Sequence, residues 1–175
     1  MSTLKVSTIS PLGTDATKTI TLGESGGTLG IVSGAKTSGF GKVGQVLQGS
    51  HSTAVTLNTS SFVDTGLTLD ITPSTTSSKI LVSVVQSIYL DGGGAGITLR
   101  ILRDTTSVFT QPVNYARYHG SASNERIFYP IQYLDSPSTT SATTYKTQGV
   151  GAFGSGHKVQ HDSIKSTITL MEILA

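Results

Sequence analysis

The sequence predicts an all-β protein, an antiparallel sandwich of short strands preceded by an extended N-terminal arm. The composition is the first observation, since 51 of the 175 residues are Ser or Thr and 20 are Gly. Thr suits a pleated, half-exposed surface, and Gly suits turns that need a positive φ. The second is the alternation of apolar and polar residues from residue 42 onward, and the third is the regular spacing of turn residues between these runs. Helical periodicity never lasts longer than a turn or two, which excludes a helical fold.

The chain has enough apolar residues to build one core. Hydrophobic residues make up 36% of it and recur in organised runs, which argues against disorder, the usual alternative for a chain so rich in Ser, Thr and Gly. A length of 175 residues leaves room for one domain and a tail. We therefore expect residues 1–40 to form the arm and residues 41–175 to form the sandwich.

The predicted arm has short apolar clusters separated by Gly, Pro, Ser and Thr. None is long enough for a secretory signal or a membrane span, so we expect a soluble chain without membrane insertion. Such a segment is expected to be disordered alone and to become ordered by docking on a partner. The apolar residues proposed as anchors are Leu4, Val6, Ile9, Ile20 and Leu22.

The first strands of the domain are predicted as hairpins. Residues 41–50 and 53–58 form the first, joined by a turn at His51. Residues 62–72 place Leu67, Leu69 and Ile71 on one face, the clearest alternation in the chain. The almost continuous apolar run 79–90 is typical of a central strand, and the turn 91–96 joins it to residues 97–104 as a second hairpin.

The later segments complete the sandwich. Residues 106–113 and 115–120 are predicted as short edge strands, because Pro112 is tolerated only at an edge. Residues 125–137 and 143–153 are expected to pair around the turn that begins at Pro137. In the closing strand, 166–175, Ile168, Leu170 and Glu172 share one face. Because this strand is apolar on both faces, it must lie inside a sheet or against another subunit.

Few residues suggest catalysis, and we expect no enzyme, cofactor or metal. Cysteine is absent, and the net charge of +2 is spread along the chain without a basic block, which argues against nucleic-acid binding. His157 and His161, with Asp162 beside them, are four residues apart, a spacing that would bring the two histidines onto one metal ion only in a helix. We expect this segment to be a solvated loop, where they would lie too far apart. The sequence 91–96 lacks the Lys and the helix of a phosphate loop. Glu172, inside an apolar strand, is expected to be paired or capped rather than to act as a general acid.

One group of aromatic and basic residues suggests contacts with a partner. Tyr and Arg are typical of binding hot spots and of surfaces that stack on sugars, but also of a core or a subunit interface. The group is therefore a candidate either for a trimer interface or for contact with a ligand, and the sequence leaves both alternatives open. The candidates are Tyr115, Arg117, Tyr118, Phe128, Tyr129 and Tyr133.

Three stretches carry a family resemblance. These are "FVDTGLTLDITPSTTSSKILVSV" from Phe62, "YLDSPSTTSATTYKTQ" from Tyr133 and "STITLMEI" from Ser166. Together they resemble short structural or tail-fibre proteins of tailed bacteriophages, especially of marine hosts. The body of these proteins is similar to the jelly roll of the C1q and tumour-necrosis-factor group. The resemblance covers residues 42–175, and the opening "MSTLKVSTI" also resembles the start of such proteins.

The resemblance implies a function in the virion. It implies a jelly-roll homotrimer on a threefold axis, with apolar strand faces packed between subunits and no catalytic residues. We then expect a surface decoration or short fibre, bound to capsid or tail proteins through the arm by strand addition and docking of apolar side chains. The alternative is an adhesin that binds host-surface glycans. A polysaccharide hydrolase would need a suitably spaced pair of carboxylates.

Overall fold

The computed structural model describes residues 43–57, 60–92, 94–113, 116–120, 124–154 and 156–174, with His119 described by its backbone alone. The chain divides into two units, Met1–Phe40 and Gly41–Ala175. The predicted arm, including Leu4, Val6, Ile9, Ile20 and Leu22, lies outside the described residues.

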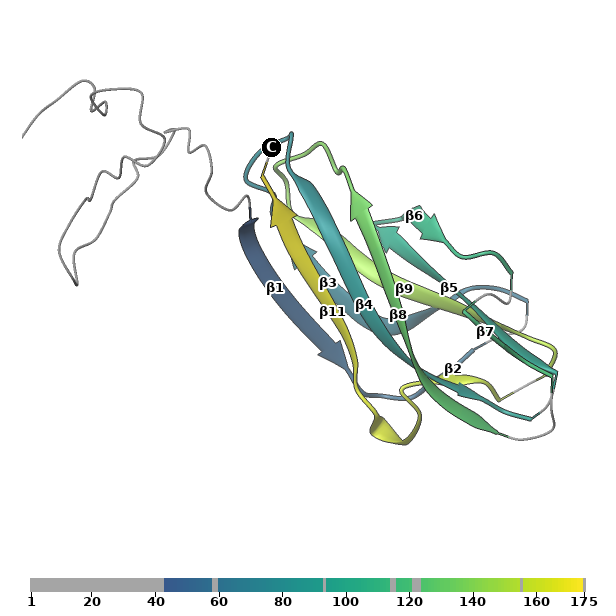
Figure 1. The fold of residues 1–175 in the computed structure, drawn as a ribbon. Helices are drawn as coiled ribbons and strands as arrows, with labels where there is room; N and C mark the ends of the chain where they lie inside the picture. Colours follow the sequence, from purple (N-terminus) through teal and green to yellow (C-terminus); the bar gives the residue numbers. More distant parts are fainter. Residues whose placement is uncertain are drawn as a thin grey trace, which may run out of the picture. The chain divides into compact units, whose positions relative to one another are not determined.

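The described part of the domain consists of two antiparallel sheets and one 3-10 turn (Figure 1). Sheet A contains β1 (Val43–His51), β2 (Val55–Thr56), β4 (Lys79–Leu90), β8 (Glu125–Asp135), β10 (Lys158–Val159) and β11 (Ser166–Ile173). Sheet B contains β3 (Val63–Ile71), β5 (Ala95–Arg103), β6 (Thr106–Thr110), β7 (Arg117–His119) and β9 (Thr143–Ala152). The turn η1 (His161–Ser163) precedes β11. The prediction of an all-β antiparallel sandwich is confirmed.

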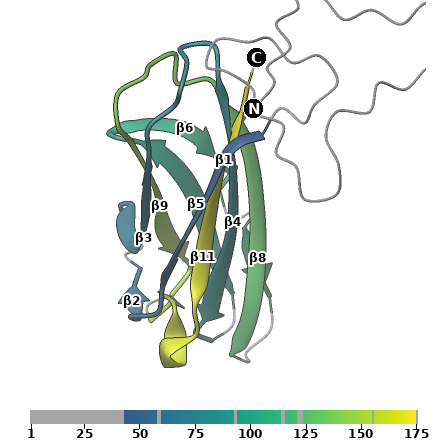
Figure 2. The ribbon, with the colours of Figure 1, turned by 90° about the vertical axis from the view of Figure 1, so that its left-hand side faces the viewer.

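The long strands have a simple order within each layer. In sheet A, β1, β11, β4 and β8 lie side by side, and β10 and β2 continue the sheet beside the last residues of β4. In sheet B the order is β3, β9, β5 and β6, with β7 also paired to β5. Figure 2 shows the two layers from the side. This order is compatible with the predicted jelly roll.

The core lies between the sheets and is built by alternation. Ile80, Val82 and Val84 of β4 are fully buried, and so are Ile97 and Leu99 of β5. Burying each such side chain contributes about 1.5–3 kcal/mol. On β3, Leu67, Leu69 and Ile71 face inward as predicted.

The three predicted hairpins are wrong. β1 pairs with β11 and β2 with β10, so these two strands do not pair with each other. β4 and β5 lie in different sheets, and so do β8 and β9. The connections from β4 to β5 and from β8 to β9 therefore lead from one sheet to the other. Turn residues reverse a chain, but they do not decide whether the next strand enters the same sheet.

The central and edge positions agree better with the sequence. β11 lies between β1 and β4, inside sheet A, as its two apolar faces predicted. β4 lies between β11 and β8, although its outward residue Val85 is exposed and its outward residue Leu81 is only partly buried within the described chain. β6 and β7 are short strands that extend sheet B beyond β5, as expected. Over the described residues, no helix is long and apolar enough to cross a membrane.

Candidate interaction surfaces

The outer face of sheet A carries a row of apolar side chains across four strands. Val46 of β1 lies opposite Met171 of β11, which lies opposite Leu81 of β4, which lies opposite Leu134 of β8. Residues directly opposite each other in an antiparallel pair point to the same face. These four side chains therefore form one continuous band, which we call the apolar row.

The rest of this face is also almost uncharged. Val85, Phe128 and Pro130 form a second apolar group along β4 and β8, with 38% of Val85 and 59% of Phe128 exposed. A polar row separates it from the first, and Gln48 donates to the Thr169 hydroxyl there. Among the outward residues of the described β1, β11, β4 and β8 pairs, the charged residues are Lys79, at the start of β4, and Arg126, which lies opposite Tyr89 near the end of β4 and forms an ion pair with Asp162.

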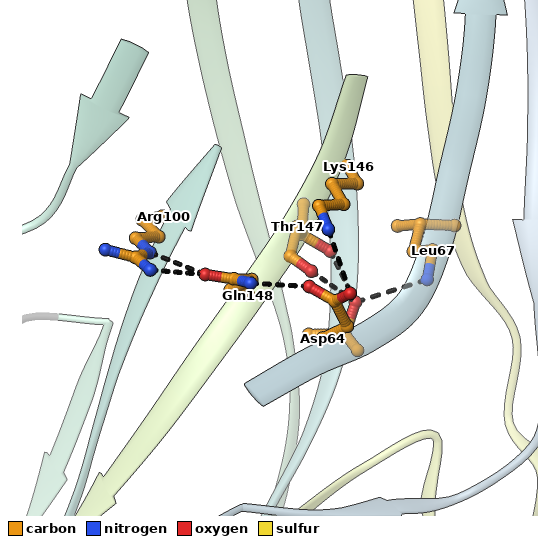
Figure 3. Close-up of polar contacts among 7 residues, drawn as sticks. Asp64, Leu67, Arg100, Lys146, Thr147 and Gln148 are labelled. Carbon is orange, nitrogen blue, oxygen red and sulfur yellow. Dashed lines mark hydrogen bonds and ion pairs between the residues drawn. The ribbon is translucent and has the colours of Figure 1, made fainter. Parts of the chain in front are cut away.

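The outer face of sheet B is polar and charged by contrast (Figure 3). Asp64 of β3 forms an ion pair with Lys146 of β9, with 2.9 Å between Asp64 Oδ2 and Lys146 Nζ. Asp64 also accepts a hydrogen bond from Gln148 of β9. Arg100 of β5 donates twice to Gln148 Oε1 and lies 4.0 Å from the ring centroid of Phe62. Partial burial raises the pKa of Asp64, but the hydrogen bonds from Lys146 and Gln148 and the nearby positive charges outweigh it, so the net pKa is lowered.

The outer face of sheet A is suited to contact with a partner, and the outer face of sheet B is suited to exposure to water. A band of exposed Val, Leu and Phe on a sheet face typically marks a contact surface, whereas an ion-paired ladder is stable in water. The apolar row spans both edges of sheet A, and Val46 and Leu134 are about half exposed at its ends. Sheet A is therefore the candidate subunit interface, and sheet B is the candidate solvent face.

Next to the charged ladder, β3 has a bulge at Gly66. The pairing register of β3 with β9 shifts between Asp64 and Thr68, and Gly66 has a φ of +80°. A Cβ at Gly66 would lie 2.3 Å from His51 Nε2, so the bulge makes space for the imidazole of the facing sheet. A hollow of about 320 Å³ opens beside Gly66 on the sheet B face.

A buried polar network joins the two sheets behind this bulge. The Thr65 and Thr147 hydroxyls lie 2.5 Å apart, and Thr147 also donates to Gln86 of β4. Gln86 donates to the Ser166 hydroxyl of β11 at 2.8 Å. Buried polar groups must find partners, so this network favours one register of the sandwich.

Glu172 is a buried carboxylate with a structural role. It accepts hydrogen bonds from the backbone N–H and the hydroxyl of Ser74, both at 2.6 Å, and from Gln45 Nε2 at 2.8 Å. Burial raises the pKa of Glu172, but these donors outweigh burial and lower the pKa to about 2. The carboxylate is ionised at neutral pH and holds the β3–β4 loop on the end of β11, in agreement with the expected paired state.

His157 and His161 have separate partners in the described part of the chain. His157 is fully buried, so the expected solvated loop is wrong at this position. Its Nδ1 accepts from the Asp91 N–H and its Nε2 faces the Ala152 carbonyl, which assigns the proton to Nε2. His161 stacks on Tyr89 at 4.1 Å, with its Nδ1 2.9 Å from Asp162. The described residues contain no group of three His, Cys, Asp or Glu placed to bind a metal ion.

The predicted aromatic group is divided among three places. Tyr129 and Tyr133 face inward from β8 and pack on the core, while Phe128 lies on the outer face of sheet A. Tyr118 lies exposed at the end of sheet B. Arg117 forms a bidentate ion pair with Glu125, which links β7 to the start of β8, and Glu125 raises the pKa of Arg117. Tyr115 lies outside the described residues.

Two further aromatic residues belong to these surfaces and were not predicted. Phe62 lies beneath Arg100, and Phe153 contacts Tyr118 edge to face with ring centroids 6.1 Å apart. Two glycines close to Phe153 in the sequence indicate a turn. Nothing in the sequence predicts that Phe153 itself adopts a left-handed backbone, with a φ of 58°.

Comparisons with known proteins give no family. Neither a family model nor a curated protein matches the chain. Among solved structures, the particle of infectious bursal disease virus strain Gt aligns at 12% identity and a TM-score of 0.39, over 75% of this chain and 38% of the viral chain. Dimeric latent PorU from Porphyromonas gingivalis aligns at 10% identity and a TM-score of 0.42, over 82% and 14%. The pilus protein of Bacillus endospore appendages aligns at 14% identity and a TM-score of 0.32, over 81% and 100%.

These likenesses are distant. The aligned part spans well under two thirds of the viral and PorU chains. At these identities and TM-scores they carry no argument about function or assembly.

Proposed function

We propose that this chain is a non-enzymatic structural component of a bacteriophage virion, a homotrimer that packs its copies together through the outer face of sheet A. The observation that carries this proposal is the apolar row on an almost uncharged sheet face. The resemblance of residues 42–175 to phage structural proteins supports both the virion placement and the trimer. Residues 1–40 would then bind the trimer to capsid or tail proteins.

A second copy of this chain is the occupant that fits the row. Each copy brings the same apolar band, so three copies around an axis cover one another's bands without a second kind of protein. Val46 and Leu134 lie on the outer strands of the row, which places apolar side chains at both sides of the contact. The charged ladder of Asp64, Lys146 and Arg100 then faces outward, where ion pairs lose no hydration.

Face packing fits β8 better than strand addition. In the described part of the chain β8 pairs with β4 along its length, and Pro130 lies in its middle. Pro has no N–H to donate, so a strand added beside β8 would lose a ladder hydrogen bond there. The copies are therefore expected to meet through side chains of the sheet face.

A charge in the apolar row tests the interface. The full-length chain should have three times its 18.2 kDa monomer mass by size-exclusion chromatography with light scattering. Leu134→Lys and, at the other end of the row, Val46→Lys should each weaken association at least tenfold, because an unpaired ammonium would be buried.

The matched control is Thr68→Lys, an exposed strand position on the outer face of sheet B. It should remain trimeric, and circular dichroism should show that all three variants keep the fold. A monomeric wild-type chain, or dissociation by Thr68→Lys equal to that by Leu134→Lys, contradicts the proposed interface.

A further inference from the structure

The end of sheet B near β7 holds two exposed aromatic rings in a fixed arrangement. Tyr118 is 56% exposed and Phe153 is 65% exposed, and their rings meet at 83°. Phe153 has a φ of 58°, a conformation that L residues other than Asn and Asp rarely adopt. Exposed rings on a constrained backbone stabilise the fold little, and such strain is concentrated at binding sites.

A hollow lies next to this pair on the outer face of sheet B. We call it the Phe62 hollow; its volume is about 210 Å³. It is lined by Phe62, Thr98, Thr110, Gln111, Val113, Val150, Gly151 and Ala152. Gly96 of β5 lies opposite both Ala152 and Tyr118, so these residues share one row across the sheet. Tyr118 therefore lies in the same row as the lining residue Ala152, and Phe153 follows Ala152 in the chain, which places the aromatic pair beside the hollow.

The Phe62 side of the hollow is also built for stacking and hydrogen bonding. Phe62 lies beneath the guanidinium of Arg100, which Gln148 holds with two hydrogen bonds. Gln148 is in turn fixed by its bond to Asp64, as Figure 3 shows. A guanidinium has five donors in one plane, more than Gln148 uses. This side offers oriented donors above an aromatic ring.

The lining decides the chemical class of the ligand. Its residues include no acid and no base, so an ionised ligand has no charged partner among the residues that line the hollow. A peptide cannot add as a strand within the middle of the sheet, because β9 is paired on both sides by β3 and β5, and β5 by β9 and β6. A flat neutral ring with apolar faces and peripheral hydroxyls fits the exposed aromatic rings and the exposed Thr110 side chain, while Thr98 and Gln111 lie buried in the lining.

We infer that the Phe62 hollow, with Tyr118 and Phe153 beside it, is a binding site for a neutral sugar. One pyranose ring stacks on the Tyr118–Phe153 pair, and its hydroxyl groups face the hollow, whose exposed polar side chain is Thr110. The site lies on the face that the proposed trimer leaves in solvent, but its chemistry does not depend on the trimer.

Calorimetric titration of the full-length chain tests this inference. The probes are neutral oligosaccharides of glucose, galactose, mannose and N-acetylglucosamine, together with sulfated counterparts. At least one neutral oligosaccharide should bind with saturation, and its sulfated form should bind no better. Phe153→Asn removes the ring but accepts the left-handed backbone, and Tyr118→Ala removes the second ring. Each should weaken binding at least tenfold with an unchanged melting temperature.

The control is Phe128→Ala, which removes an equally exposed ring from the outer face of sheet A and should leave sugar binding unchanged. The inference is overturned if no neutral probe binds, if both aromatic-pair variants bind as the wild type does, or if Phe128→Ala weakens binding as much. It is also overturned if Phe153→Asn dissociates the oligomer, because the aromatic pair would then be a subunit contact. Light scattering reports the subunit interface separately, so failure of one proposal does not imply failure of the other.

Discussion

At the scale of single residues, Glu172 shows how a buried charge is made stable. Its three hydrogen-bond donors come from Ser74 and Gln45, which are 98 and 127 residues away in the sequence. The sequence predicted that a Glu inside an apolar strand must be paired, because burial of an unpaired carboxylate is costly. The partners could not be predicted, because they depend on which strand ends meet.

Substitution of Glu172 should change the dependence of stability on pH. The pKa of Glu172 in the folded state is about 2, below its ordinary value of 4.5, so its contribution to stability is fully present above pH 4.5 and is lost as the pH falls toward 2. Glu172→Gln should therefore lower the free energy of unfolding by roughly 1–3 kcal/mol at pH 7 and by much less at pH 2. Urea denaturation at both pH values measures the difference.

Thr68→Ala, an exposed neutral change on the outer face of sheet B, serves as the reference and should have the same small effect at both pH values. If Glu172→Gln were equally destabilising at pH 7 and pH 2, the ionised carboxylate would not be the stabilising group.

At the scale of elements, the strands were predictable and their partners were not. Leu67, Leu69 and Ile71 alternate in the sequence and face the core. The expected hairpins at 41–58, 79–104 and 125–153 were wrong, because in each case the flanking strands pair with distant segments. Alternation is a local property of a strand, whereas pairing in a sandwich is decided by the packing of two complete faces.

The bulge in β3 gives a sharp test of one element. Gly66 and Gly92 have similar φ values, +80° and +76°, but a Cβ at Gly66 meets His51 whereas a Cβ at Gly92 meets nothing within 4 Å. Gly92→Ala should cost about 1–2 kcal/mol from the backbone conformation alone, and Gly66→Ala should cost at least about 1 kcal/mol more from the collision. Thermal or urea unfolding of both variants measures the difference.

The double variant His51→Ala/Gly66→Ala should be less destabilised than the sum of its single changes, because the first change removes the group that the new Cβ would meet. If the effects were additive, or if Gly66→Ala and Gly92→Ala lowered the free energy of unfolding equally, the absence of a side chain at Gly66 would not be needed to make space for the His51 imidazole.

At the scale of the whole molecule, the two outer faces have different chemistry. Sequence alternation indicated that β4 and β11 are apolar on both sides, but not that their outward residues align with Val46 and Leu134 in one row. In the predicted aromatic group, Phe128 and Tyr118 lie exposed, and Tyr129 and Tyr133 pack on the core. The alternation of residues along β8 indicates which of its aromatic side chains share a face. The contact between Tyr118 and Phe153 joins two segments that are distant in the sequence, so no local pattern predicts it.

Deletion of residues 1–35 should separate attachment from folding. The core residues of the described chain lie within Gly41–Ala175, so the truncated chain should keep its melting temperature and its oligomeric state. Incorporation into virus particles should be lost if the arm is the anchor, and mass spectrometry of purified particles measures it. An unfolded truncated chain, or particles that contain it at the wild-type level, would contradict this division of roles.

The pairing of β1 with β11 joins residues 43–51 to residues 166–173. Contacts between such distant segments close large loops, and sandwiches dominated by them fold in milliseconds to seconds. The apolar row takes Val46 from one end of the domain, Met171 from the other, and Leu81 and Leu134 from between them. The row does not exist until all four strands are in register, so any association through this face has to follow the folding of each copy and cannot guide it.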